Sequence, residues 1–244
     1  MSNTLTTQQL VDNYNELLSL IDKHISSPRK EQLKQLYDDH ADRIASMPAS
    51  GVEHHHNCFV GGYVAHVIGV VKTALKIRAL WIESGATLVG SEEELVFAAI
   101  NHDLGKIGTE QEAQYQNNDS EWHRKNQGKL YKNNIANPFM TIPDRSLKLL
   151  ADRKITVSDG EWYAIKLHDG LYDDCNKPYY VSHDPNSKLR TDLPYILHQA
   201  DLLAARVEYE AWLCDKTKAD KTAADQQQKT TSQLKSRFDQ LFTT

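Results

Sequence analysis

The chain has 244 residues, of which 40% are hydrophobic and 25% charged, and its formal net charge at pH 7 is −5. This length corresponds to one large or two small domains, and the hydrophobic content is enough for a sizeable core. Lysine and arginine are spread along the chain without a basic block. That distribution argues against a surface for duplex nucleic acid but leaves a short single strand open.

The cysteines and the N-terminal segment indicate the compartment. Cys58, Cys175 and Cys214 are widely spaced and form no CxxC pair, so a reducing compartment is expected rather than a disulfide framework. Residues 1–9 are polar, and no run approaches about 18 apolar residues, so neither a signal peptide nor a membrane span is expected. These features predict a cytoplasmic protein.

The first part of the chain has strong helical patterns. Apolar residues at three- and four-residue steps predict helices over 7–27 and 30–47. A longer pattern continues from the pair Gly61-Gly62 to about Trp81. His66 lies on the apolar face of this helix, where a histidine is more often a satisfied core residue than a metal ligand.

The next predicted helix carries a His-Asp pair at its end. Ser91 with Glu94 forms a capping-box pattern before a run of apolar residues, and the helix ends at His102-Asp103. The pair offers one nitrogen and one oxygen ligand to a divalent cation. Alone, such a dipeptide is more often a buried histidine bonded to its neighbour. Lys106 would project from the following turn toward an anion held at the metal.

The middle of the chain has weaker signals. Residues 109–140 are expected to be irregular or weakly helical. Ser158 with Glu161 is a second capping box, and it begins a helix that ends at His168. Residues 171–191 are expected to form a polar loop, and a loop of this length in a compact domain is often functional.

Two helical segments complete the chain. Residues 192–213 form an apolar helical pattern with Asp201 inside it, and a buried carboxylate needs a cation or several hydrogen-bond donors. Residues 215–244 are polar and are expected to form a helix that folds back on the body or is used between subunits. Its apolar stripe consists of Leu234, Phe238, Leu241 and Phe242. Neither a strand pattern nor an internal repeat stands out, so an all-α protein is predicted.

Three motifs follow one another along the chain. They are Gly61-Gly62-Tyr63-Val64-Ala65-His66, Asn101-His102-Asp103-Leu104-Gly105-Lys106 and His198-Gln199-Ala200-Asp201-Leu202-Leu203-Ala204. Together, over roughly residues 54–210, they resemble the HD-domain superfamily of metal-dependent phosphohydrolases. The first is similar to the Gly-Gly-x-x-x-His motif of a branch that includes bacterial 3′–5′ exoribonucleases. The resemblance implies a helical HD domain over 51–213, with N-terminal helices 1–50 packed on it and a polar C-terminal helix over 214–244.

The resemblance also implies a metal centre. Its ligands would be His66, His102, Asp103 and Asp201, holding a divalent cation that the sequence leaves open among Mn, Fe, Co, Ni, Zn and Mg. Open coordination positions would take water and a phosphate oxygen, and Lys106 would contact the phosphate.

Some members of the superfamily hold a second metal on histidines in the interval where His123 and His168 lie. Dinuclear members often have two adjacent histidines at the later position; here it is His168-Asp169, which favours one metal. In that case His123 and His168 would bind substrate or act as a general acid beside Asp103 and Lys106. The other expected substrate contacts are His55 or His56, Arg124, Lys129 and Tyr172, with a solvated basic face as the alternative for Arg124 and Lys129.

Three functions follow from this resemblance. The first is hydrolysis of a phosphoester or phosphoanhydride bond of a small nucleotide, which suits the acidic balance and the polar, aromatic segment 171–184. The second is a single-strand 3′–5′ nuclease, for which no oligonucleotide-binding barrel segment is evident. The third is a non-catalytic module that senses a nucleotide, although all ligand types are present. We expect no duplex nucleic acid and no membrane as partners, and leave a homo-oligomer open.

Overall fold

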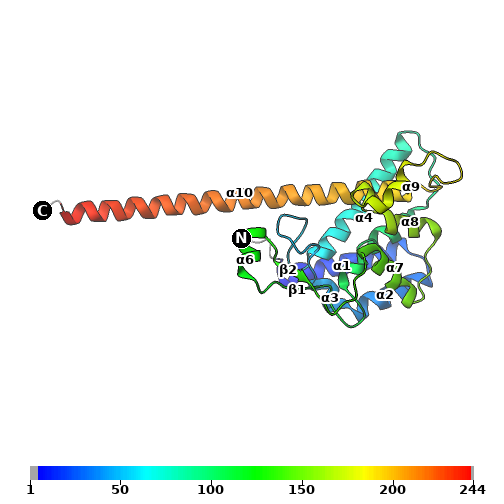
Figure 1. Ribbon diagram of the computed structural model, residues 1–244, viewed down its shortest axis with the longest axis horizontal. Helices are drawn as coiled ribbons and strands as arrows, with labels where there is room; N and C mark the ends of the chain where they lie inside the picture. Colours follow the sequence, from blue (N-terminus) through cyan, green and yellow to red (C-terminus); the bar gives the residue numbers. More distant parts are fainter. Residues whose placement is uncertain (1–4, 243–244) are drawn as a thin grey trace.

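The structure is a computed structural model that describes the backbone of residues 5–242 and the side chains of residues 5–222 and 226. The N-terminal helices are α1 (Thr7–His24), α2 (Arg29–Asp39) and α3 (Ala41–Ser46). The larger later helices are α4 (Gly62–Glu83), α5 (Glu92–Asn101), α7 (Ile142–Asp152), α8 (Asp159–Leu167) and α10 (Leu193–Phe242). The short elements are 3-10 helix η1 (Leu104–Ile107), strand β1 (Tyr115–Asn117), α6 (Glu121–Gln127), strand β2 (Tyr131–Asn133), 3-10 helices η2 (Gly170–Tyr172) and η3 (Asp174–Asn176), and α9 (Lys177–Val181). The predicted all-α class is confirmed (Figure 1).

Helices α4 and α5 lie innermost in the body. α4 packs against α1, α3, α5 and α10, and α5 is buried from Leu95 to Asn101. Tyr63 on α4 and Phe97 on α5 are fully buried. Burial of one large apolar side chain stabilises the fold by roughly 1.5–3 kcal/mol, so the apolar residues of these two helices drive them to the centre.

The capping boxes place α5 and α8 side by side. Each helix starts with the predicted box, Ser91 with Glu94 and Ser158 with Glu161. Ser158 Oγ also donates to Glu94 Oε1 at 2.7 Å, which joins the two N-termini. The helices are 10 and 9 residues long and pack against each other, so their C-terminal ends, each followed by a His-Asp pair, meet at the same depth of the body.

Three expectations about secondary structure are wrong. The helix expected over 30–47 is interrupted at His40, whose φ of −118° and ψ of 19° are not helical, giving α2 and α3. The irregular segment 109–140 contains the antiparallel hairpin β1–β2 with Tyr115 opposite Asn133. Its strands have three residues each and no apolar alternation, which is why no strand pattern was evident. The segment 171–191 holds η2, η3 and α9 rather than an uninterrupted loop.

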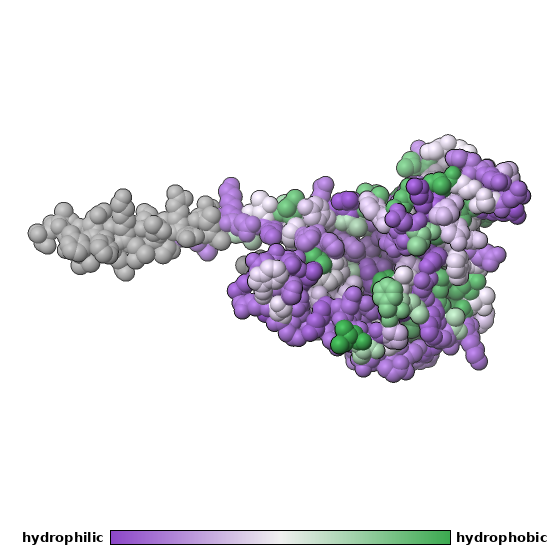
Figure 2. Space-filling model, viewed as in Figure 1, coloured by the Kyte–Doolittle hydropathy of each residue, from purple (hydrophilic) through white to green (hydrophobic). Residues whose placement is uncertain are grey.

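Helix α10 runs without a break across the boundary expected at 213/214. Figure 1 shows its C-terminal part extending away from the body instead of folding back on it. The side chains of Leu234, Phe238, Leu241 and Phe242 lie outside the described residues. The face of the body seen in Figure 2 is mostly hydrophilic, with apolar side chains in small separate groups. Among the described helices, none is both long and apolar enough to cross a bilayer.

Gly105 allows η1 to lie directly on α7. A Cβ at this position would overlap with the carbonyl oxygen of Ile142, and Ser146 Oγ accepts the Gly105 N–H at 2.7 Å. We expect Gly105→Ala to lower the free energy of unfolding by about 1–3 kcal/mol, as overpacked sites do. For a chain of this size the melting temperature should fall by roughly 2–12 °C in thermal denaturation followed by circular dichroism.

The matched control is Gly69→Ala on α4. A Cβ at Gly69 meets its nearest atom, Glu208 Oε1, at 3.6 Å, which is an ordinary contact. Alanine is also favoured over glycine in a helix. A melting temperature that is equal or higher in Gly69→Ala and lower in Gly105→Ala supports the close packing of η1 on α7, and equal values in both variants refute it.

Candidate metal centre

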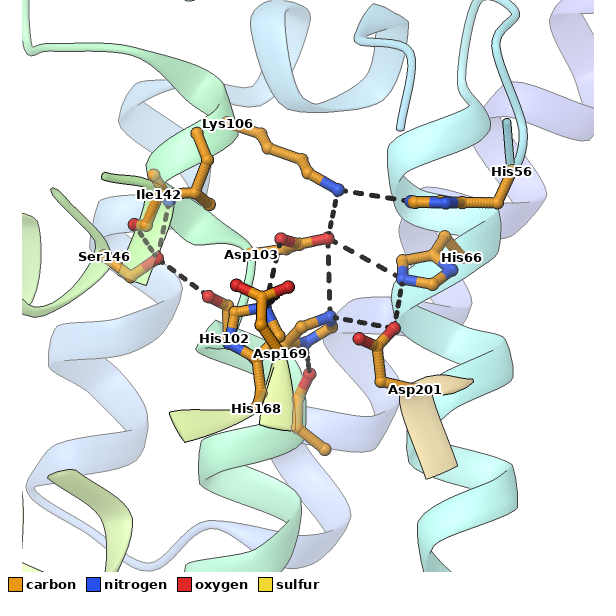
Figure 3. Close-up of polar contacts among 12 residues, drawn as sticks. His56, His66, His102, Asp103, Lys106, Ile142, Ser146, His168, Asp169 and Asp201 are labelled. Carbon is orange, nitrogen blue, oxygen red and sulfur yellow. Dashed lines mark hydrogen bonds and ion pairs between the residues drawn. The ribbon is translucent and has the colours of Figure 1, made fainter. Parts of the chain in front are cut away.

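Three imidazole rings converge at one buried point. His66 comes from α4, His102 from the end of α5 and His168 from the end of α8, and each is at most 3% exposed (Figure 3). His102 Nδ1 and His168 Nδ1 each lie 2.8 Å from a carbonyl oxygen three residues earlier in the chain. His66 Nδ1 lies 3.0 Å from the Glu208 carboxylate. Because these oxygens only accept, Nδ1 carries the proton in the neutral rings, and each Nε2 presents its lone pair to the common centre.

Two carboxylates complete this centre. Asp103 Oδ2 lies 3.4 Å from His102 Nε2 and 3.7 Å from His66 Nε2. Asp201 Oδ1 lies 3.1 Å from His66 Nε2 and 3.9 Å from His102 Nε2. Ligand atoms at about 2.0–2.2 Å from one cation are separated by distances of this order.

The donor set fits a cation. His102 Nε2 is buried and has no hydrogen-bond partner among the described residues, a costly arrangement for a polar atom unless something binds it. The groups whose ligand atoms lie within 4.8 Å of one another include His66 with His102 and Asp201, and His102 with Asp103 and His168. These buried His and Asp residues could therefore hold a metal ion. A further group joins His168, Asp169 and Asp201.

The charges of the centre are strongly coupled. Burial alone would raise the pKa of Asp103, but Lys106 and His102 outweigh it and hold that pKa well below its ordinary value. Burial alone would lower the pKa of His66, but Glu208 and Asp201 outweigh it and raise that pKa to about 10. For Asp201, His66 and His102 likewise overcome burial and lower the pKa. The carboxylates therefore stay anionic at neutral pH, and His66 is protonated unless a cation takes the place of its Nε2 proton.

Lys106 bridges the centre to the histidine run. Its Nζ lies 2.5 Å from Asp103 Oδ2 and 3.3 Å from His56 Nε2. Burial and the neighbouring Lys106 charge lower the pKa of His56 to about 2, so His56 is neutral and accepts a hydrogen bond from the ammonium. Residues 51–56 are held in place by backbone pairing, since Glu53 N donates to Gly128 O at 2.7 Å.

A cavity of about 430 Å³ opens beside the centre. His168, Asp169 and Asp201 form its boundary with the centre. Residues expected to bind substrate also line it, namely His55, His56 and Tyr172. The candidate ligands, which come from four helices, thus lie beside a space that a small molecule can enter.

Other expected residues lie elsewhere. His123 and Arg124 are exposed on α6, and Lys129 is exposed just before β2. None of the three belongs to the possible metal-holding groups found among the described residues, and none lines the cavity. His123 Nδ1 instead lies 2.7 Å from Ser120 Oγ, next to the N-terminus of α6. His123 is therefore not part of any possible site for a second metal among the described residues.

Glu208 was missed by the sequence analysis. It lies seven residues after Asp201, or about two helical turns, so both carboxylates point from the same face of α10. Helix α10 thus supplies both Asp201, a candidate ligand, and Glu208, whose carboxylate lies beside Nδ1 of His66, the ring nitrogen that faces away from the centre. The seven-residue spacing between Asp201 and Glu208 is the feature of the sequence that could have indicated Glu208. Arg206, Tyr209 and His198, which line the cavity, carried no such signal.

We expect Glu208→Ala to weaken metal binding by about 10- to 100-fold, because carboxylates that orient a ligating histidine contribute this much. Glu208→Gln should weaken it less, since the amide oxygen still accepts from His66 Nδ1. The metal dissociation constant is to be measured by competition with a chromophoric chelator. Glu210→Ala, exposed two residues along α10, is the control. Equal dissociation constants for Glu208→Ala and Glu210→Ala would rule out the orienting role.

Comparison of the chain with protein-family models, with curated proteins and with solved structures finds no match. The function is therefore argued from the site itself.

Proposed function

We propose that the protein is a metal-dependent phosphohydrolase of the HD-domain superfamily, acting in the cytoplasm on a phosphoester or phosphoanhydride bond of a nucleotide. The observation that carries the proposal is the convergence of three buried Nε2 atoms, from His66, His102 and His168, on the carboxylates of Asp103 and Asp201. The order of the three motifs along the chain supports the same family.

The chemistry of the donors favours a borderline or hard divalent cation. Two imidazoles and two carboxylates suit Mn, Fe, Co, Ni, Zn or Mg. When bound, such a cation supplies a Lewis acid for a phosphoryl oxygen and lowers the pKa of water at the site. His66, His102, Asp103 and Asp201 would hold it.

The remaining groups have roles of their own. The Lys106 ammonium, beside Asp103, would stabilise negative charge that develops on the phosphoryl group. His168 faces both the centre and the cavity, where it would donate a proton to the leaving oxygen. His56 accepts from Lys106 and so orients its ammonium.

The test is a set of reconstitutions. The protein is stripped of metal, loaded separately with each of the six cations, and assayed for phosphate or pyrophosphate release from a panel of nucleotides. Single-stranded oligonucleotides are included. We expect metal-dependent release from a small nucleotide. Shortening of oligonucleotides alone would favour the nuclease, and nucleotide binding without turnover under every metal would favour a sensing module.

The His168→Ala variant distinguishes a site with one metal from a site with two. With one metal on His66, His102, Asp103 and Asp201, His168→Ala should keep about one metal per chain and lower turnover. Asp169 and Asp103 overcome the effect of burial and raise the pKa of His168. The wild type should therefore lose turnover as pH rises through that pKa, and the variant should lack this alkaline limb. Elemental analysis and pH–rate profiles check this; a fall from about two metals to about one would instead make His168 a ligand.

A further inference from the structure

The cavity beside the metal centre has features that restrict the substrate. We infer that it binds the nucleoside part of a nucleoside monophosphate, with Arg206 and Tyr209 of α10 as the residues that recognise it. This inference rests on the proposed phosphohydrolase function, because the phosphate would lie at the metal centre. It adds the substrate class and two recognition residues.

The size of the cavity favours one nucleotide. Its volume of about 430 Å³ is near the lower end of the range of roughly 300–1,000 Å³ found for small-molecule sites. Asp201 and His168 lie on its wall, so a molecule that fills it also touches the candidate metal centre. An oligonucleotide would need a longer groove lined with cations and stacking aromatics.

The charge of the cavity argues against a nucleoside triphosphate. Among the described residues that line it, Arg206 is the one lysine or arginine, against the carboxylates of Asp169 and Asp201. The nearby Lys106 ammonium already contacts Asp103 at 2.5 Å. Further phosphate groups would need additional charge-assisted donors, which the lining does not supply. A single phosphate at the metal centre is therefore the best match.

Arg206 and Tyr209 suit a flat ring. They are three residues apart on α10, so their side chains lie on neighbouring positions of one helix face. Arg206 is exposed and has no ion pair or hydrogen bond with the described residues. Tyr172, from η2, lines the same cavity, and its ring lies 6.4 Å from that of His198. A base can stack on tyrosine, and a guanidinium can donate to base oxygen and nitrogen atoms.

The reaction balances without a further reactant. Water adds to phosphorus, and the bond between phosphorus and the nucleoside oxygen breaks. One proton of the water ends on the nucleoside hydroxyl, and the remaining OH stays with the phosphate. The products are the nucleoside and inorganic phosphate.

The test compares two substrates that share the phosphate chemistry. One is a nucleoside monophosphate, in a purine and a pyrimidine form, and the other is glycerol 2-phosphate, a phosphomonoester without a base or any other ring. In Arg206→Ala and Tyr209→Ala we expect the KM for nucleoside monophosphate to rise by roughly 5- to 150-fold, the range of a lost base contact of about 1–3 kcal/mol. The kcat, the metal content and the kinetics with glycerol 2-phosphate should stay as in the wild type. The control is Arg190→Ala, an exposed arginine before α10 that does not line the cavity.

A second measurement does not depend on the metal. Binding of the free nucleoside to metal-free protein is followed by equilibrium dialysis, and both variants should bind it more weakly than the wild type and Arg190→Ala. Unchanged nucleoside binding and unchanged KM in both variants would overturn this inference but leave the proposed phosphohydrolase function standing. Preference for a triphosphate that is lost in Arg206→Ala would also overturn it, by assigning Arg206 to a second phosphate. Absence of hydrolysis of every phosphate ester under every metal would overturn the proposed function and the inference together.

Discussion

Asp103→Ala is expected to lose stoichiometric metal and to reduce phosphate release by at least about 10³-fold, because a catalytic metal supplies several kcal/mol of transition-state stabilisation. Asp103 is the carboxylate that the other groups share. Its Oδ2 lies 3.4 Å from His102 Nε2 and 2.5 Å from Lys106 Nζ. Its Oδ1 lies 3.8 Å from His168 Nε2. Elemental analysis and the nucleotide assay measure the two losses.

The same substitution leaves the Lys106 ammonium buried without its carboxylate, which can cost about 3–5 kcal/mol. His102→Ala is therefore a companion variant, because it removes a ligand nitrogen and leaves the pair between Asp103 and Lys106 intact. It should lose metal and activity to the same extent. Asp119→Ala, which removes an exposed ion pair with Lys132, is the control. Full metal content in folded Asp103→Ala and His102→Ala would disprove the metal centre.

Lys106→Ala is expected to keep its metal and lose turnover. A donor aimed at charge that develops in the transition state contributes about 2–4 kcal/mol, which corresponds to a fall in kcat of roughly 30- to 1,000-fold. The Lys106 side chain is 11% exposed and directed at Asp103, so its charge lies beside the proposed phosphoryl position. Steady-state kinetics and elemental analysis are to be run on the same preparation.

Lys148→Ala serves as the control for this variant. Lys148 is an exposed lysine of α7 whose ion pair with Asp152 lies on the surface. If Lys106→Ala turns over as fast as Lys148→Ala, the ammonium only neutralises Asp103 and has no catalytic role. If Lys106→Ala loses metal, it acts by holding the Asp103 carboxylate in position.

Local signals determined where the main helices begin and end. The capping boxes at Ser91 and Ser158 act within three residues, so they were readable without the rest of the chain, and both are present. The apolar periodicity around His66 and Asp201 likewise predicted helices α4 and the first part of α10. These signals depend on neighbouring residues only, which is why the sequence contained them.

Where the local sequence signals are weak, the predicted secondary structure is wrong. The hairpin β1–β2 is held by cross-strand pairing between Tyr115 and Asn133, eighteen residues apart in the chain, and no apolar alternation announces it. Neither strand, taken alone, contains the partner strand that decides its conformation.

The sequence alone determined the helical class, the helix ends that carry His102 and His168, and the candidate ligand types. Only the tertiary structure decided which of these groups meet. The pairing of the α5 and α8 N-termini brings His168 beside His102, whereas α6 leaves His123 on the surface. The packing of α10 on α4 places Glu208 behind His66. The physical reason is the distance in sequence over which each effect acts. Capping and periodicity act over about one helical turn. The site instead joins residues as far apart in the sequence as 66 and 208, and these meet only when whole helices pack together.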